Sequence, residues 1–165
     1  MSSIPKLILH IAVHILHDVA VDRSQEPCGL CLQPSPTCLF YFRCSHSGIQ
    51  VDMEKSTCPR LARFSYTKSR DVTEESPCGN VLVPCPRCPK NAPGVWKYNL
   101  QQHFATKHCS SLVPANLQIT QWEIDALRVH WDNRQSLKQK PSQRKRKKKT
   151  KLAISDTHST RLVYR

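Results

Sequence analysis

The feature that most constrains this chain is a set of two cysteines and two histidines near its midpoint. Two residues separate Cys85 from Cys88, 14 separate Cys88 from His103, and four separate His103 from His108. Two cysteines at this spacing can hold one ion from a single tight turn. Two histidines four or five residues apart project from one side of a helix toward the same point. We therefore predict that these four residues bind Zn²⁺ in a tetrahedral site.

The residues between the two pairs support this prediction. Trp96, Leu100 and His103 lie at positions i, i+4 and i+7, which would place two apolar side chains on the helix face of the first histidine. Nine cysteines and eight histidines make accidental pairs easy to form, and this apolar register argues against chance. Pro89, Pro93 and Gly94 predict an irregular loop before the helix rather than a regular hairpin.

A second pair with the same spacing, Cys28 and Cys31, predicts another metal site in the first half of the chain. The other two ligands must come from Cys38, Cys44, His46, Cys58 and Cys78. We choose Cys58 and Cys78, because the Pro59 and Gly79 that follow them mark turns, and we keep Cys38 and Cys44 in reserve. The alternative is that some of these cysteines are buried as small hydrophobic residues.

Composition favours metal ions over a large hydrophobic core. The 165 residues include 12 prolines and only 7% aromatic residues, so small modules stabilised by ions or disulfides are expected. The cysteine count of nine is odd, and two Cys-x2-Cys pairs are present. Both observations favour reduced thiolates in an intracellular compartment, and a secreted, disulfide-bonded protein is the alternative.

Positive charge is concentrated near the C-terminus. The net charge is +13, and residues 134–151 hold ten Lys or Arg and no Asp or Glu, which leaves +3 for the other 147 residues. Such a run is predicted to be disordered and to bind polyanions such as DNA, or a nuclear import receptor. Its densest part comprises Arg144, Lys145, Arg146, Lys147, Lys148 and Lys149. We therefore expect the protein in the nucleus.

The first residues predict an amphipathic helix over 4–21, with two apolar stripes and a polar face. His10, His14 and His17 are interpreted as part of that polar face, with a metal site as the weaker alternative. A secretory signal is the rival interpretation, and the three histidines count against it. The segment is too short and too polar to span a bilayer.

Further elements follow from local pattern. Residues 39–42 and 49–53 are predicted strands that pair across a turn at 45–48, residues 61–66 are a third strand candidate, and 67–77 are a loop. A helix is predicted over 121–135, with Thr120 and Glu123 forming a capping box and Ile119 and Ile124 a hydrophobic staple. This helix is expected to pack on the predicted zinc-binding segment around Cys85–His108 or to bind a partner.

Together these signals predict a small, metal-stapled α+β fold with short antiparallel strands, a finger helix, a C-terminal helix and a disordered basic tail. The expected organisation is an N-terminal helix (1–22), a Cys-rich zinc-binding region (23–80), a zinc finger (81–110), a helix (118–135) and a basic tail (136–165).

The segment Asn99-Leu100-Gln101-Gln102-His103-Phe104-Ala105-Thr106-Lys107-His108 resembles the end of BED-type zinc fingers, which tolerate variable spacing between cysteines and histidines. It departs from them in lacking a Ser/Thr run before the asparagine and in its N-terminal aromatic positions. The resemblance implies DNA binding linked to mobile elements or chromatin.

A longer resemblance covers most of residues 27–165. It rests on Pro27-Cys28-Gly29-x-Cys31, Cys58-Pro59-x-Leu61, Ser76-Pro77-Cys78-x-Asn80 and the run from Cys85 to Asn99, and it extends to Ile154–Leu162. These residues are similar to an uncharacterised zinc-finger-like family that is expanded in mushroom-forming fungi. The resemblance implies that Cys58 and Cys78 are ligands, and it implies no established activity.

The finger helix suggests a way to read DNA. If Leu100 and His103 point inward, Asn99 and Gln102 face outward, where each amide can bond adenine in the major groove. Lys97 and Lys107 flank them and are predicted to meet phosphates. The alternative is that this face binds protein or only supports the fold.

We therefore expect a nuclear, non-enzymatic zinc-finger protein that binds DNA. The alternative is a zinc-stabilised protein-interaction module in chromatin or transposon-derived complexes. An enzyme is disfavoured, because catalytic zinc keeps an open position, whereas both predicted sites are filled by four Cys or His ligands. Neither a membrane nor a small-molecule substrate is expected as a partner.

Overall fold

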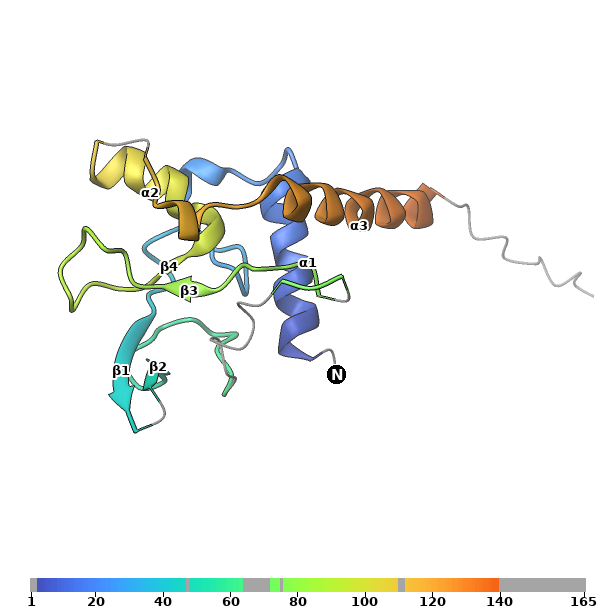
Figure 1. Ribbon diagram of the computed structural model, residues 1–165. Helices are drawn as coiled ribbons and strands as arrows, with labels where there is room; N and C mark the ends of the chain where they lie inside the picture. Colours follow the sequence, from blue (N-terminus) through green and yellow to red (C-terminus); the bar gives the residue numbers. More distant parts are fainter. Residues whose placement is uncertain (1–2, 47, 64–71, 75, 110–111, 140–165) are drawn as a thin grey trace, which may run out of the picture.

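The computed structural model describes residues 3–46, 48–63, 72–74, 76–109 and 112–139. Its α+β fold combines short antiparallel strand pairs with helices, as the sequence predicts (Figure 1). In chain order the elements are α1 (Ile4–His17), β1 (Tyr41–Ser45), β2 (Gly48–Asp52), β3 (Leu82–Val83), β4 (Val95–Trp96), α2 (Leu100–Lys107) and α3 (Gln121–Gln139). Short 3₁₀ turns cover Arg23–Gln25, Lys97–Asn99 and Ala115–Leu117.

Helix α1 forms the centre of the main core, and its apolar stripes explain why. Its buried side chains are Ile8, Ile11, Ala12, Val13 and Ile15. They pack with residues from distant parts of the chain, namely Leu30, Phe40, Trp96, Tyr98 and Leu127. The N-terminal segment is therefore a structural element of the fold.

The helix ends four residues earlier than the pattern predicts. Asp18 adopts an extended backbone conformation, and its Oδ1 accepts a hydrogen bond from the Ala20 amide at 3.0 Å. An aspartate that bonds the backbone two residues ahead forms a turn that competes with the helix. Val19, which lies within the predicted helix 4–21, is consequently exposed.

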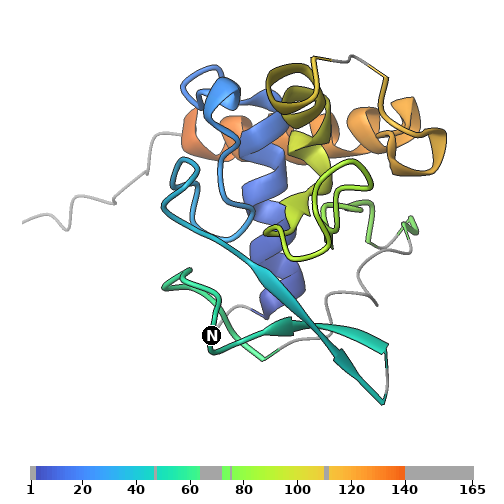
Figure 2. The ribbon, with the colours of Figure 1, turned by 90° about the vertical axis from the view of Figure 1, so that its left-hand side faces the viewer.

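Helix α3 crosses the C-terminal end of α1 (Figures 1 and 2). Leu127 is fully buried in the main core, and the Trp131 ring lies 5.4 Å from the His14 ring in an edge-to-face arrangement. Helix α3 thus packs mainly against α1, whereas the sequence predicted that it would pack on the zinc finger at 81–110.

The ends of α3 also differ in part from expectation. Thr120 Oγ1 accepts a hydrogen bond from the Glu123 amide at 3.2 Å, so the predicted cap is present. The Glu123 carboxylate does not close a capping box, because it turns into the protein toward Gly79 and Tyr98. The helix runs to Gln139, four residues past its predicted end. The remainder of the predicted basic tail lies outside the described residues.

Strands β1 and β2 form the predicted hairpin, with Tyr41 opposite Asp52 and Ser45 opposite Gly48. Gly48 has a φ of 105°, a left-handed conformation that favours glycine in a turn. Residues 61–63 of the third strand candidate are not in a strand, and the rest of that candidate lies outside the described residues. None of the helices in the described part of the chain combines the length and hydrophobicity needed to cross a bilayer.

Candidate metal centres

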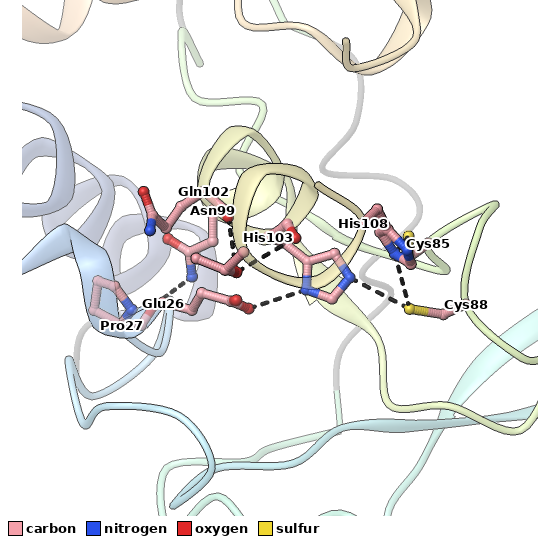
Figure 3. A network of polar contacts seen from close by, with 9 residues as sticks. Glu26, Pro27, Cys85, Cys88, Asn99, Gln102, His103 and His108 are labelled. Atoms are coloured by element: carbon pink, nitrogen blue, oxygen red, sulfur yellow. Dashed lines mark hydrogen bonds and ion pairs between the residues drawn. The ribbon is translucent and has the colours of Figure 1, made fainter. Parts of the chain in front are cut away.

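The finger centre is built by the β3–β4 hairpin and α2. Cys85 and Cys88 lie in the loop after β3, where the Cys88 amide bonds the Cys85 carbonyl at 3.3 Å. His103 lies on α2 and His108 caps its C-terminal end. The four ligand atoms lie within 4.8 Å of one another (Figure 3).

The separations between these atoms fit a single tetrahedral ion. Sγ of Cys88 lies 3.3 Å from Nε2 of His103 and 3.3 Å from Nε2 of His108, and Sγ of Cys85 lies 3.3 Å from Nε2 of His108. A tetrahedral zinc with ordinary bond lengths separates sulfur and nitrogen ligands by about 3.6 Å. The geometry therefore accommodates one ion, and the four residues predicted from spacing are brought together.

A small apolar cluster supports this centre, but it differs from the predicted helix stripe. Leu100 and Phe104 are buried on α2 and pack with Val81, Val83, Val95 and Val113. Trp96 belongs to β4 and to the main core, because α2 begins only at Leu100. The predicted irregular loop is present between two strands of two residues each, which pair Leu82 with Trp96 and Val83 with Val95.

The second centre contains Cys28, Cys31, Cys38 and Cys58, whose sulfurs lie within 4.8 Å of one another. Sγ of Cys58 lies 3.8 Å from those of Cys28 and Cys31, and Sγ of Cys31 lies 3.4 Å from that of Cys38. Four thiolates around one tetrahedral zinc are separated by about 3.8 Å, whereas a disulfide bond is about 2.0 Å long. These cysteines are arranged as ligands of one ion.

The fourth ligand is a correction to the sequence prediction, which chose Cys78 and held Cys38 in reserve. The chain after Cys31 folds back, with the Cys28 amide bonded to the Gln33 carbonyl at 2.8 Å. The Thr57 amide then bonds the Leu39 carbonyl at 3.0 Å, which sets Cys58 beside Cys38. Such a pairing between distant segments left no signal in the spacing of the cysteines.

Cys78 is instead a core residue. Its side chain is buried, and its sulfur lies 3.9 Å from the Tyr98 hydroxyl oxygen. Burial raises the pKa of Cys78 to about 11, which keeps the thiol protonated at neutral pH. This is the alternative role that the sequence left open for some of the cysteines.

The pKa shifts of the thiols in the four-cysteine centre indicate that a bound cation is needed to ionise them together. Burial raises the pKa of Cys28 and Cys58, and burial together with the hydrogen bond to Cys31 raises that of Cys38 to about 12. Burial also opposes ionisation of Cys31, but hydrogen bonds from the Gln33 backbone and the neighbouring thiols lower its pKa. Without a positive ion, the four thiols therefore do not ionise together.

Both centres have supporting contacts that the ligand spacing did not reveal. The Leu30 amide donates to Cys28 Sγ at 3.4 Å. A side chain at Gly29 would place its Cβ 2.5 Å from the Trp96 ring. Glu26 Oε2 lies 3.2 Å from Nδ1 of His103, and this hydrogen bond raises the pKa of His103.

No family model, curated protein or solved structure matches this chain. The resemblances to BED-type fingers and to the fungal family therefore stay predictions.

The predicted DNA-reading face needs correction at two positions. Asn99 is buried and its Nδ2 donates to the Pro27 carbonyl at 2.8 Å, because the 3₁₀ turn before α2 directs it inward. Lys97 is largely buried and pairs with Glu123, with Nζ 3.1 Å from Oε2. Lys107 is exposed and Gln102 is half-buried, so both side chains can still be reached by a partner such as DNA. The basic residues 144–149 lie outside the described residues.

The histidines of α1 belong to neither metal centre in the described part of the chain. Nδ1 of His14 bonds Oδ2 of Asp18 at 2.8 Å, and the ring of His10 lies edge-on to it at 4.9 Å. These contacts fit the interpretation of a polar helix face.

Proposed function

We propose that this protein binds two Zn²⁺ ions and that both ions are structural. The observation that carries the proposal is the presence of two sets of four Cys or His ligand atoms at tetrahedral separations. Tetrahedral S₂N₂ and S₄ sets favour zinc or an iron–sulfur centre, and sulfur separations near those of a mononuclear site favour zinc. Four protein ligands leave no open position for water or substrate, which supports a non-enzymatic role.

Elemental analysis of the purified, reduced full chain tests this proposal. We expect close to two zinc ions per chain, with little iron. A value of one ion would remove the four-cysteine centre from the proposal, and a value of zero would overturn it entirely. Alkylation of the cysteines before the measurement should release both ions, since both centres depend on thiolates.

For the biological role, we infer that this is a nuclear protein that binds DNA through electrostatic attraction between basic side chains and phosphates. The support is the run of ten basic residues at 134–151, which would also be read by a nuclear import receptor. Two of the four finger positions suggested for DNA contact are occupied by contacts within the protein, so base reading by α2 has little support. Exposed Arg87 and Lys107 beside the finger centre add local positive charge.

Accumulation of a fluorescent fusion in the nucleus tests the location. Replacing Arg144–Lys149 with glutamine should abolish accumulation, while replacing the exposed Lys6 and Lys55 should not. Nuclear accumulation that survives the first change would remove the import role of this run.

A zinc-stabilised interaction module in chromatin or transposon-derived complexes is the second candidate. It is favoured by two large apolar side chains on α3 that are left at the surface, Trp122 at 48% and Val129 at 59% exposure. They lie seven residues apart, which places them on one face of the helix. Absence of DNA binding by the full chain would give this candidate first place.

A further inference from the structure

Residues 26–29 touch both metal centres. Cys28 is a ligand of the four-cysteine centre, and the two residues before it bond the finger histidine His103 and the 3₁₀ turn that leads into its helix. Glu26 Oε2 lies 3.2 Å from Nδ1 of His103, and the Pro27 carbonyl accepts a hydrogen bond from Asn99 at 2.8 Å (Figure 3). The segment therefore connects the two centres directly.

The contact with His103 uses the nitrogen that the finger centre leaves free. Nε2 of His103 faces Cys88 Sγ, while Nδ1 faces the carboxylate of Glu26 (Figure 3). A carboxylate at Nδ1 keeps the proton on that nitrogen, which leaves the lone pair of Nε2 for a metal ion. It also fixes the direction of the ring. Glu26 thus has the position of a residue that orients a metal ligand.

Glu26 is held in place by the fold around it. Its side chain is only 15% exposed, so water competes weakly for the carboxylate. Its backbone has a φ of 49°, an uncommon left-handed conformation for a residue other than glycine. The Ser35 amide bonds the Gln25 carbonyl at 2.9 Å, and this bond belongs to the loop that carries Cys31 to Cys38. The position of Glu26 accordingly depends on the four-cysteine loop.

Packing strengthens the same connection. Gly29, between Cys28 and Cys31, lies so close to Trp96 that any side chain there would overlap the indole ring. The Trp96 ring in turn meets Phe40 edge-on, with centroids 5.4 Å apart. Movement of the four-cysteine loop therefore disturbs the strand that leads into the finger helix.

We propose that Glu26 and Pro27 couple the two metal centres, so that an ion in the four-cysteine centre raises the affinity of the finger centre for its own ion. The inference rests on the proposed function, since both centres must bind an ion. An ion held by Cys28, Cys31, Cys38 and Cys58 fixes the loop, and the fixed loop holds His103 and Asn99 in their binding positions. Because coupling between two binding sites is reciprocal, an ion in the finger also tightens the four-cysteine centre.

The test is a Co²⁺ titration of the reduced full chain, with absorption spectra that distinguish an S₂N₂ from an S₄ centre. We expect Glu26→Ala to weaken Co²⁺ binding at the finger by about 10- to 100-fold, the usual effect of losing a residue that orients a ligand. Glu26→Gln keeps an acceptor for the Nδ1 proton and should recover much of this loss. Glu54→Ala, which removes an exposed carboxylate elsewhere, is the matched control and should change nothing.

The second arm removes the other centre. Cys38→Ser should weaken the finger centre by about 5- to 150-fold, the usual range for coupled sites. In that background, Glu26→Ala should have little additional effect, because the loop no longer holds residue 26 in place. If the Cys38→Ser protein does not fold, the reciprocal effect decides the question: Glu26→Ala should also weaken Co²⁺ binding at the four-cysteine centre, and an unchanged affinity there would overturn the coupling.

Magnetic resonance of the zinc-loaded protein adds a readout that a purely structural role would not move. A protonated Nδ1 on His103 should give a slowly exchanging proton signal in the parent and in Glu26→Gln, and it should exchange rapidly in Glu26→Ala. Finger affinities in Glu26→Ala and Cys38→Ser equal to that of the parent would overturn the coupling. A parent chain that binds fewer than two ions would instead overturn the proposed function itself.

Discussion

At the scale of single residues, Glu123 shows how far a local pattern can mislead. The pattern assigned Glu123 to a surface capping box and Lys97 to phosphate contact, but the structure pairs these two side chains inside the protein. Glu123 is fully buried and accepts bonds from the Gly79 amide at 2.7 Å, the Tyr98 hydroxyl and Lys97. Burial, together with the negative charge of Glu123, raises the pKa of Tyr98, so the phenol stays protonated and donates.

Glu123→Ala should therefore lower the free energy of unfolding by about 3–5 kcal/mol, because it leaves a largely buried lysine without its counter-charge and two donors without an acceptor. Asp125→Ala, on the exposed side of the same helix, should cost less than about 0.5 kcal/mol. Urea unfolding of the zinc-loaded proteins measures both. Equal losses in the two variants would show that the buried pair contributes little.

Single substitutions test whether Cys38 or Cys78 is the fourth ligand of the four-cysteine centre. Cys38→Ser removes a ligand, so the protein should lose the zinc ion of the four-cysteine centre and keep about one ion per chain. Cys78→Ser changes a buried thiol that belongs to neither set of four ligand residues, so this variant should keep two. Zinc content after gel filtration against a weak chelator measures the difference. Retention of both ions in Cys38→Ser, with loss in Cys78→Ser, would restore the ligand set predicted from the sequence.

At the scale of elements, the sequence predicts what is periodic or locally spaced. The apolar stripes of α1, the β1–β2 turn, the Thr120 cap and the finger ligands each depend on residues close together in the chain. The fourth cysteine depends on the bond between Thr57 and Leu39, and the direction of Asn99 depends on a 3₁₀ turn against Pro27. Such contacts between distant segments leave no periodic trace, which is why both assignments differ from the structure.

The crossing of α3 over α1 can be tested through Leu127, which is fully buried between them. Leu127→Ala should lower the free energy of unfolding by about 2–5 kcal/mol, because it opens a cavity in the main core. Val129→Ala removes an exposed side chain two residues further on and should cost less than about 0.5 kcal/mol. Denaturant unfolding followed by circular dichroism measures both. A small effect of Leu127→Ala would mean that α3 does not depend on α1.

At the scale of the whole molecule, two modest apolar clusters each adjoin a metal centre. The main core surrounds α1 and includes Cys28 and Cys58, while the second cluster includes Cys85 and lies under α2. A small core gains little from burial alone, and structural zinc in finger peptides supplies on the order of 10 kcal/mol of folding free energy. The other 147 residues carry a net charge of only +3, so the basic run at 134–151 contributes most of the positive charge of the protein.

This distribution of charge predicts that the basic run at 134–151 determines the salt dependence of DNA binding. Replacing the six basic residues Arg144–Lys149 with glutamine should flatten the dependence of log affinity on log salt by as much as about 5, since each phosphate contact contributes about 0.9. Lys107→Ala should remove at most one contact. Gln102→Ala should leave the preference between a specific and a scrambled duplex unchanged, because Asn99, its expected partner in base reading, is bonded to Pro27. Titrations of each variant with both duplexes at several salt concentrations measure these effects. A loss of discrimination of roughly 1–3 kcal/mol in Gln102→Ala would instead identify α2 as a reading helix.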